Sequence, residues 1–385
     1  MKPNLTIKPT LPLGFKANGL ACGIKKRGRC DLGLIFSEKP SVACGLFTAN
    51  KITSGSIKFS QANLNKARKF RAIIVNSGNA NCFTNEDSFD KADEIADELA
   101  RILKIKKQEV LLASTGIIAR PFPVQRIKKA IPALVEGLSG SGLTRIARAI
   151  ITTDTFIKLS SVRLNIGKRI ITICGLAKGA GMIAPNLISP CATMLCFILS
   201  DANITQKALR VALQNAVDNS FNCITIDGCM STNDTLLMLS NSAAFNPKIK
   251  EGTPEFNRFC SGLSQICLSL AKMIVRDAEG ATKFIQIKVT QARSYKEAKQ
   301  VALSIANSNL FKAAMFGRSA NFGRIIAAVG ASGVDVVEKD LKVKVSSLKK
   351  KDIYVIIGLN RGNCAAVVYT SDLTPEYVKI NASYS

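Results

Sequence analysis

The sequence predicts a layered fold of the α/β or α+β class, and three observations support this prediction. Runs typical of buried or half-buried strands alternate with amphipathic segments of helical periodicity along most of the chain. Apolar residues make up 47% and charged residues 21% of the sequence, which is ordinary usage for a globular protein. The 385 residues contain no internal repeat and no low-complexity linker, and their number suffices for two domains or three.

The first half of the chain predicts a strand, two helices and a β-hairpin, in that order. The apolar run 71–75 (RAIIV) predicts the strand, and 143–154 (LTRIARAIITTD) predicts the second helix. The segment 160–176 alternates on both sides of the turn sequence NIGK, which predicts the hairpin. The first helix, 89–105, has its acidic residues early, as the helix dipole prefers, and its spacing puts these apolar side chains on one face: Ile95, Leu99, Ile102 and Leu103.

The second half continues the alternation and ends in β-structure. Pro254 lies in the first turn of one predicted helix, where its missing N–H costs nothing. Helical periodicity predicts the helices 205–221, 253–275 and 294–308. Apolar or alternating runs predict the strands 194–201, 223–228, 283–289, 341–345, 353–359 and 365–370.

The composition excludes several kinds of chemistry. The chain has no histidine, which excludes Ser-His-Asp and Cys-His catalysis and imidazole metal sites. A general base must then be a perturbed lysine or carboxylate, a thiolate, or an α-amine, whose pKa of about 7.7–8 is closest to neutrality. The 12 cysteines include no CxxC pair, which argues against a zinc site and against a disulfide scaffold. With no long apolar span and no apolar leader, the sequence predicts a cytoplasmic protein without a membrane segment.

The formal net charge of +26 is unusual and suggests anionic partners. Nucleic acid would be attracted by such a charge, as would acidic small molecules. However, the basic runs 25–29, 104–107 and 349–351 are short, scattered and not interleaved with aromatic residues. A solvated basic surface is therefore the favoured interpretation, and nucleic-acid binding is not expected.

Four polar or glycine-rich stretches are candidates for a site. The turn 178–182 (KGAGM) lacks the spacing of a nucleotide-binding loop, so it is either an ordinary turn or a turn that presents Lys178 to an anionic substrate. The loop 226–235 (IDGCMSTNDT) could hold a metal, but an Asx-turn and cap cluster is the simpler interpretation. Asparagines and a glycine in 75–83 predict a tight turn with left-handed residues. Glu279 is, by default, a solvated loop residue.

Thr193 is a candidate nucleophile because of what precedes it. The small residues Cys191 and Ala192 leave the peptide bond before Thr193 sterically open. Attack of its hydroxyl on the Ala192 carbonyl, followed by hydrolysis, would make Thr193 a new N-terminus with its own α-amine as base. This device needs no histidine. The alternative is a threonine that simply opens a buried strand.

Eleven stretches follow one another along the chain: GIKKRGRCDLGLI, LFTAN, VNSGNAN, ASTGII, TTDT, KGAGMIAPN, ATML, DGCMSTNDT, EGATKF, MFGRSANFGRIIAAVG and INASYS. In this order they resemble the bifunctional ornithine acetyltransferase/N-acetylglutamate synthase family of arginine biosynthesis. The resemblance implies self-cleavage between Ala192 and Thr193 into chains 1–192 and 193–385. It also implies an αββα-type sandwich, and association of the two chains into a heterotetramer with two copies of each.

The same resemblance implies an activity and the residues that perform it. Thr193 would take the acetyl group of N-acetylornithine and pass it to glutamate in a ping-pong cycle, with Thr115 and Gly116 as the oxyanion hole. Acetyl-CoA is a second donor in members with the synthase activity, and neither a metal nor a bound cofactor is implied. The implied substrate contacts, in addition to the nucleophile, are Thr152, Lys178, Glu279, Asn381 and Ser385.

This sequence departs from the family pattern in three places. Additional residues lie between Pro185-Asn186 and the Ala-Thr-Met-Leu motif, Phe322 replaces a tryptophan, and Ser385 replaces a terminal threonine. Two alternative functions follow: a self-processed amidohydrolase or aminopeptidase of similar mechanism, and a decayed, basic, nucleic-acid-binding relative. A comparison of acetyl transfer to glutamate with release of acetate would distinguish the acetyltransferase from the amidohydrolase. Salt-dependent RNA binding without acetyl transfer would favour the nucleic-acid-binding relative.

Overall fold

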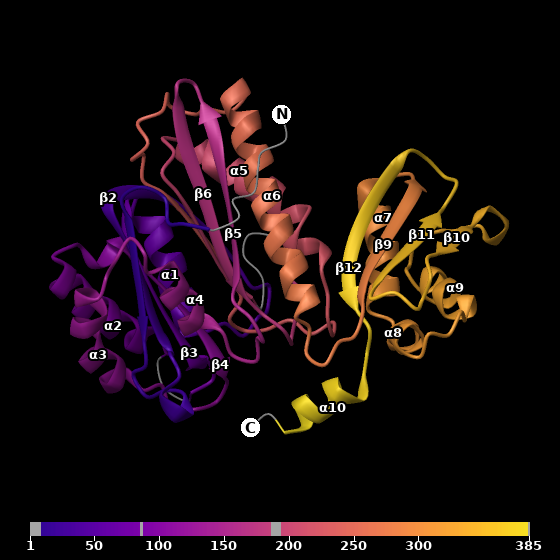
Figure 1. The fold of residues 1–385 in the computed structure, drawn as a ribbon, viewed down its shortest axis with the longest axis horizontal. Helices are drawn as coiled ribbons and strands as arrows, with labels where there is room; N and C mark the ends of the chain where they lie inside the picture. The colour runs from indigo at the N-terminus through magenta and orange to yellow at the C-terminus, as the bar shows by residue number, and fades with distance from the viewer. Residues whose placement is uncertain (1–8, 85–87, 186–193, 384–385) are drawn as a thin grey trace. The chain divides into compact units, whose positions relative to one another are not determined.

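The computed structural model describes residues 9–84, 88–185 and 194–383, and these form two compact units (Figure 1). Each unit has its own sheet and is described by itself. Unit 1 comprises Met1–Gly179, Pro185–Phe221 and Met230–Leu270. Unit 2 comprises Ala180–Ala184, Asn222–Cys229 and Ala271–Ser385.

Unit 1 contains an eight-stranded sheet that the long strand β2 joins together. Its order is β4-β3-β2-β8-β7-β6-β5, with β1 paired to β2; the pairs β3–β4 and β7–β8 are parallel and the others antiparallel. The first part of β2 pairs with β3, whereas Val42–Phe47 pairs with β8. The strands are β1 (Phe15–Leu20), β2 (Leu32–Phe47), β3 (Phe70–Asn79), β4 (Val110–Ile117), β5 (Lys158–Ile166), β6 (Arg169–Lys178), β7 (Leu195–Ser200) and β8 (Thr235–Ser240).

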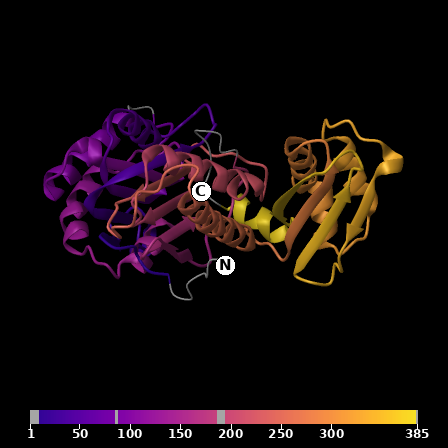
Figure 2. The same cartoon turned by 90° about the horizontal axis from the view of Figure 1, so that it is seen from above.

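The two parts of this sheet, β4-β3-β2 and β8-β7-β6-β5, share a core between them. Helices cover the outer face of each part, which gives the α-β-β-α layering (Figures 1 and 2). Helices α2 and α3 pack on the β2–β3–β4 part, where Ile95 of α2 meets Ile74 of β3. The inner faces share one core, which joins Ile73 to Phe197 of β7. Helix α6 lies so close to β6 that a Cβ on Gly175 would be 2.7 Å from Leu270. The helices are α1 (Gly55–Lys66), α2 (Ser88–Leu103), α3 (Val124–Glu136), α4 (Leu143–Ile150), α5 (Gln206–Asp218) and α6 (Pro254–Arg276).

Unit 2 is a four-stranded sheet in the order β10-β11-β9-β12, with α7, α8 and α9 on one face (Figures 1 and 2). Alternate residues of the strands, such as Ile287, Val355 and Val368, are buried against Val301 of α7 and Phe311 of α8. The strands are β9 (Phe284–Ala292), β10 (Lys342–Val345), β11 (Asp352–Gly358) and β12 (Cys364–Ser371), and the helices are α7 (Tyr295–Ala306), α8 (Asn309–Phe316), α9 (Phe322–Gly330) and α10 (Pro375–Ala382).

Hydroxyl side chains begin many of these helices. Each accepts a hydrogen bond from the N–H three residues later, which satisfies a donor that the first helical turn leaves free. The strongest sequence signal is at α10, where Thr374 caps the helix and Pro375 occupies its first turn. The capping residues of this kind are Ser54, Thr205, Thr253, Ser294, Ser308 and Thr374.

Most predicted helices and strands are confirmed, but the predicted strand 223–228 is wrong. This stretch follows a short 3-10 helix, Phe221–Cys223, and makes one isolated bridge between Ile224 and Tyr369. The cause is Asp227, whose carboxylate accepts hydrogen bonds from nearby backbone N–H groups and holds the chain in a turn. Elements that the sequence analysis did not identify include β1, β2, β4, β8, α1, α3 and α8 to α10.

Unit 1 contains residues on both sides of the predicted cleavage position, because β7 and β8 pair with strands of the first half. The compact units therefore do not coincide with the two chains that self-cleavage would produce. Ala192 and Thr193 themselves lie outside the described residues. Among the helices that the structure describes, none has both the length and the apolar character that a membrane span requires.

Candidate active site

The end of β4 carries the predicted oxyanion pair in a conformation that requires glycine. Thr115 is buried, and Gly116 has φ +134°, a value that other residues rarely adopt. Strand β4 runs beside β3 here, and a Cβ on Gly116 would lie 2.3 Å from the carbonyl carbon of Gly78. Because any larger residue would clash with that backbone, the Thr115–Gly116 peptide is fixed against the end of β3.

A buried network of side-chain hydrogen bonds supports the end of β4. Ser114 Oγ lies 2.6 Å from Ser56 Oγ and donates to Asn76 Oδ1 at 2.6 Å. Asn233 donates to the carbonyl of Ser114 at 2.8 Å and also to that of Ala80. Two of the candidate loops, 75–83 and 226–235, thus support β4 through side-chain hydrogen bonds.

The turn predicted for 75–83 is confirmed only in part, because β3 continues through Asn79 and the chain leaves the strand after it. Gly78, Asn81 and Phe83 have positive φ, and Asn79 Oδ1 accepts from the Asn81 N–H. The cap interpretation of 226–235 is also supported, because Ser231 Oγ accepts from the Asn233 N–H. Among the described residues, no group of acidic or sulfur side chains is arranged to hold a metal.

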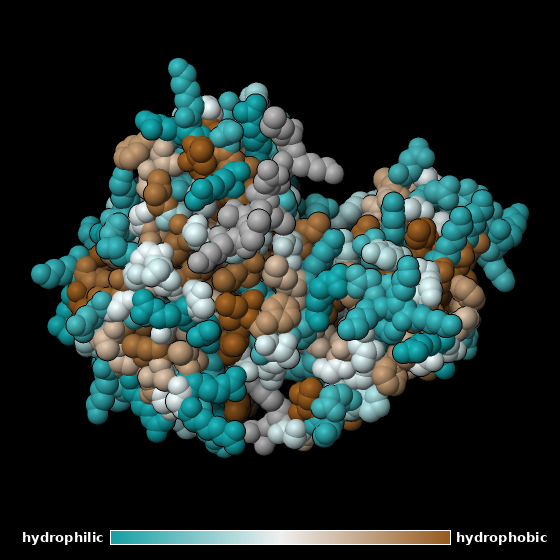
Figure 3. Space-filling model, viewed as in Figure 1, coloured by the Kyte–Doolittle hydropathy of each residue, from teal (hydrophilic) through white to brown (hydrophobic). Residues whose placement is uncertain are grey.

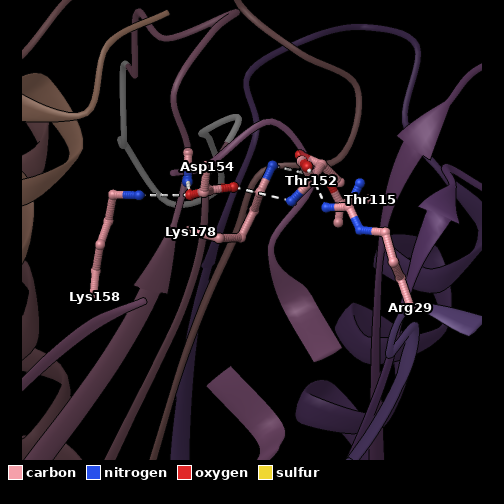
Figure 4. A network of polar contacts seen from close by, with 7 residues as sticks. Arg29, Thr115, Thr152, Asp154, Lys158 and Lys178 are labelled. Carbon is pink, nitrogen blue, oxygen red and sulfur yellow. Dashed lines mark hydrogen bonds and ion pairs between the residues drawn. The ribbon is translucent and has the colours of Figure 1, made fainter. Parts of the chain in front are cut away.

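Lys178 ends β6 and is buried beside Thr115 of the predicted oxyanion pair. Only 6% of the residue is exposed, and its Nζ lies 3.5 Å from Thr115 Oγ1 (Figure 4). A buried ammonium group needs nearby negative charge or strong acceptors. Asp154 supplies part of that charge, because the charge of Lys178 is one of the causes that lower its pKa.

Asp154 is the centre of the hydrogen-bond network of Figure 4. Its carboxylate accepts from Lys158 Nζ at 2.6 Å, the Gly179 N–H at 2.7 Å and the Thr152 N–H at 3.0 Å. The side chains of Asp154 and Lys158 are both fully buried. Burial raises the pKa of Asp154, but the charges of Lys178 and Lys158 and the Gly179 N–H outweigh this and leave it at about 2. The sequence analysis selected Thr152 of this motif and missed Asp154.

Thr152 is held from the other side by the basic loop 23–31. The Arg29 guanidinium donates to the Thr152 carbonyl at 3.2 Å (Figure 4). Lys25 Nζ donates to the carbonyls of Ile151 and Cys30 at 2.7 and 2.8 Å. Burial, together with the charge of Arg29, lowers the pKa of Lys25 to about 8. The loop therefore fixes the segment that contains Thr152.

Asp234 is a second carboxylate that the sequence analysis did not single out as functional. It is fully buried, and neither of its oxygens has a hydrogen-bond partner of normal geometry among the described residues. Burial raises its pKa well above the usual range, opposed by the charge of Lys178. The next residue, Thr235, donates its N–H to the Met194 carbonyl, which places Asp234 beside the start of β7.

Unit 2 brings together the other two predicted substrate contacts that the structure describes. Asn381 of α10 donates to Glu279 Oε2 at 2.9 Å. The Glu279 N–H donates to the Ala180 carbonyl, and a Cβ on Gly181 would lie 2.3 Å from Glu279 Oε2. A side chain at position 181, in the KGAG turn, would therefore displace the Glu279 carboxylate.

Asp227 ties this turn to α10. Its carboxylate accepts from the N–H groups of Met182 and Ile183 and from the Tyr377 hydroxyl at 3.2 Å. Burial raises the pKa of Tyr377, and the adjacent Asp227 charge adds to the effect. The sequence analysis placed Asp227 in a capping loop and did not connect it with the C-terminal helix.

The predicted site residues therefore fall into two groups. Thr115, Gly116, Thr152 and Lys178 belong to unit 1. Glu279 and Asn381 belong to unit 2. The remaining predicted residues, Ala192, Thr193 and Ser385, lie outside the described residues.

Comparisons with known proteins identify the family. Residues 16–349 match the model of the ArgJ family. A protein of Geobacter sulfurreducens named arginine biosynthesis bifunctional protein ArgJ is 42% identical over 392 residues, which cover 96% of this chain and 98% of that protein. A protein of the same name from Caldanaerobacter subterraneus subsp. tengcongensis is 40% identical over 401 residues and covers 98% of each chain.

Two solved structures of similar proteins align with about half of the chain. The ArgJ protein of Bacillus halodurans covers 48% of this chain and 97% of its own, with 31% identity and a TM-score of 0.46. The ornithine acetyltransferase of Mycobacterium tuberculosis, solved in complex with ornithine, covers 48% and 99%, with 33% identity and a TM-score of 0.45. The sequence matches alone decide the assignment: this chain is an enzyme of the ArgJ family of arginine biosynthesis bifunctional proteins.

Proposed function

We propose that this chain transfers the acetyl group of N-acetylornithine to glutamate, which yields ornithine and N-acetylglutamate, with Thr193 as the nucleophile. The observation that carries the proposal is Lys178, buried next to Thr115 at the end of β4. A buried cation and a glycine-dependent turn, in a chain without histidine, suit the binding and acyl transfer of an amino acid.

Self-cleavage is the first step of the proposal. The Thr193 hydroxyl attacks the Ala192 carbonyl, the peptide bond becomes an ester, and water hydrolyses the ester to free the Thr193 α-amine. The resulting chains, 1–192 and 193–385, would remain together because β6 pairs with β7 and β2 pairs with β8 across the cut. We further propose that two copies of each chain form a heterotetramer.

Acetyl transfer then proceeds in two halves. Thr193 Oγ attacks the acetyl carbonyl while the α-amine takes its proton, and the tetrahedral oxyanion is stabilised at Thr115 and Gly116. Each such donor is worth roughly 3–4 kcal/mol at a transition state. The bond to nitrogen breaks, ornithine leaves with the proton, and an acetyl ester remains on Thr193. The amine of glutamate attacks this ester and regenerates the hydroxyl.

The remaining residues bind the amino-acid part of the substrates. Lys178 would pair with a carboxylate, and Thr152 would add a hydrogen bond. Glu279 and Asn381 would bind an ammonium group, with Ser385 completing the contact. Acetyl-CoA would be an alternative donor, and the cycle as written uses no metal and no bound cofactor.

A cytoplasmic location is part of the proposal. Eleven described cysteines are all free thiols, and many of them are buried. Unpaired buried thiols are typical of proteins from reducing compartments.

Denaturing electrophoresis tests the cleavage. The wild type should give two bands of similar size, of which one begins with Thr193 on N-terminal sequencing. Thr193→Ala should give one band of about 41 kDa, the mass of the whole chain being 41.3 kDa. A single band for both proteins would refute the cleavage.

Acetyl transfer from N-acetylornithine to glutamate tests the activity. The expected products are ornithine and N-acetylglutamate in equal amounts. Release of acetate without N-acetylglutamate would instead identify a self-processed amidohydrolase.

A further inference from the structure

A pocket of about 470 Å³ in unit 1 lies beside the segment that contains Thr152. Two arginines, Arg29 and Arg148, and the aromatic ring of Phe156 contribute to its walls, together with Cys30, Ile151 and Ile157. This volume is in the range of small-ligand sites, which are about 300–1,000 Å³. None of these lining residues takes part in the proposed acyl transfer.

The two arginines of the pocket have no ion-pair partner in the part of the chain that the structure describes. The one acid in the same loop, Asp31, is fully buried, and its carboxylate accepts from the N–H groups of Cys22, Ile24 and Lys25 at 2.7, 2.7 and 2.8 Å. Asp31 therefore stabilises the fold of the loop and pairs with neither guanidinium group. Arg29 donates one N–H to the Thr152 carbonyl at 3.2 Å, and since a guanidinium group has five N–H donors, others remain for an anion.

Lys25 adds a further positive charge next to the pocket. Its Nζ donates to the carbonyls of Cys30 and Ile151, which both line the pocket. These hydrogen bonds fix the backbone on two sides of the pocket. At neutral pH this ammonium group is mostly charged, because its pKa, although lowered by burial and by Arg29, is about 8.

Phe156 adds an apolar surface. The residue is 41% exposed, and Lys158 Nζ lies 4.9 Å from the centroid of its ring. An exposed ring beside two guanidinium groups is suited to a ligand that carries both phosphates and a planar base, since arginine binds phosphate bidentately and aromatic rings stack on bases.

We propose that the Arg29–Arg148 pocket binds the phosphate groups of a phosphorylated acyl donor, a nucleotide thioester such as acetyl-CoA. The identity of the ligand as an acyl donor rests on the proposed function, whereas phosphate binding does not. A small ligand fits the observations better than nucleic acid does, because the site is a concave pocket with one aromatic residue and the basic run 25–29 is short.

Calorimetric titration of the full chain tests the proposal with 3′,5′-adenosine diphosphate, coenzyme A and pyrophosphate as probes. Arg148→Gln should weaken binding of 3′,5′-adenosine diphosphate and coenzyme A by about tenfold or more, the effect of one lost charged hydrogen bond. Arg145→Gln is the matched control, since Arg145 is exposed on the same helix, α4, and does not line the pocket. It should bind as the wild type does.

Cys30 provides a second readout that needs no variant. Because it lines the pocket, 3′,5′-adenosine diphosphate should slow its alkylation, measured by peptide mass spectrometry. The exposed thiol Cys229, in unit 2, should react at an unchanged rate. Equal protection of both thiols would refute the pocket as the binding site.

Three further outcomes would overturn the proposal: no binding of the adenosine probe to the wild type, equal weakening by both variants, or tighter binding of an RNA oligonucleotide than of any small probe. Binding of pyrophosphate without coenzyme A would overturn the acyl-donor identity. Acetyl transfer from N-acetylornithine is measured on the same preparation. If transfer fails while the adenosine probe binds, the proposed function is rejected and the pocket stands.

Discussion

Asp154 connects more parts of the unit 1 site than any single residue that the sequence analysis selected. It accepts hydrogen bonds from Lys158 and Gly179, on β5 and directly after β6, and from Thr152. Its negative charge also lies near Lys178. A change at Asp154 therefore alters both the position of Thr152 and the electrostatic environment of Lys178.

Asp154→Asn should lower the free energy of unfolding by about 3–5 kcal/mol, because it leaves the fully buried Lys158 ammonium without its carboxylate. Urea-induced unfolding measures the change. Asp97→Asn is the control: Asp97 pairs with Lys107 at 3.2 Å on the surface, where such pairs contribute little. If the two variants lose equal stability, the buried pair has no special role.

Asp234 predicts a dependence of stability on pH with the opposite sign from an ordinary salt-bridged carboxyl group. Its pKa is raised in the folded state by burial, so the unfolded chain binds fewer protons than the native protein between the two pKa values. Stability that is present below the unfolded pKa of about 3.9 is therefore lost as the pH rises toward the folded pKa. Asp234→Asn removes this loss.

The measurement compares Thr193→Ala with Thr193→Ala/Asp234→Asn, so that cleavage does not differ between the samples. The double variant should be the more stable at pH 8, and its advantage should shrink as the pH is lowered to 4. An advantage that is constant over this range would contradict the raised pKa.

At the scale of elements, α10 is attached to the rest of unit 2 by a few polar contacts. None of its described residues is buried, yet it carries Asn381. The Tyr377 hydroxyl bonds to Asp227, and the backbone of Glu376–Tyr377 lies so close to Gly280 that a Cβ there would be 2.6 Å from the Tyr377 nitrogen. Positioning of this helix therefore depends on Asp227 and on Gly280.

Tyr377→Phe should raise the KM for the amino-acid substrates more than it lowers kcat, because it loosens the helix that carries Asn381 without touching the nucleophile. A net loss of about 1 kcal/mol, the usual contribution of one hydrogen bond, corresponds to about fivefold in KM. Steady-state kinetics measures it, with Tyr354→Phe on the exposed face of β11 as the control. An unchanged KM would show that Asp227 does not position α10.

The long elements could be predicted because their patterns are regular. Helices α2 and α6 and strand β9 follow the 3.6- and 2-residue periods closely. The strand predicted at 223–228 failed because the carboxylate of Asp227 competes for the backbone N–H groups of that loop.

The candidate site was only partly predictable. Thr115, Gly116 and Lys178 stand in motifs that resemble a family, so their positions could be named. Asp154 and Asp227 also bind partners 25 and 45 residues away in the sequence, Gly179 and Met182, and no local pattern indicates such a pairing.

At the scale of the whole molecule, apolar burial and backbone pairing hold together the segments on both sides of residue 193. The core of unit 1 contains Leu176 from before this position and Phe197 and Leu237 from after it. On the visible face of the molecule, hydrophilic side chains are interspersed with hydrophobic ones (Figure 3).

If the chain cleaves itself as proposed, the two products should elute together in gel filtration at low salt and at 1 M salt alike, because salt screens surface charges but does not weaken apolar contacts. Denaturant should separate them. Dissociation by salt alone would mean that electrostatic attraction, rather than the shared sheet and core, holds the chains together.

Strand β2 also sets an order of events during synthesis. Its second part, Val42–Phe47, finds its partner only in β8, which the ribosome makes almost 200 residues later. Until then Val42–Phe47 and the end of β6 have open edges that invite aggregation. If the chain cleaves itself between Ala192 and Thr193 as proposed, it must be completed and folded first. The segments 1–192 and 193–385 synthesised separately would each expose the unpaired edges of an incomplete sheet.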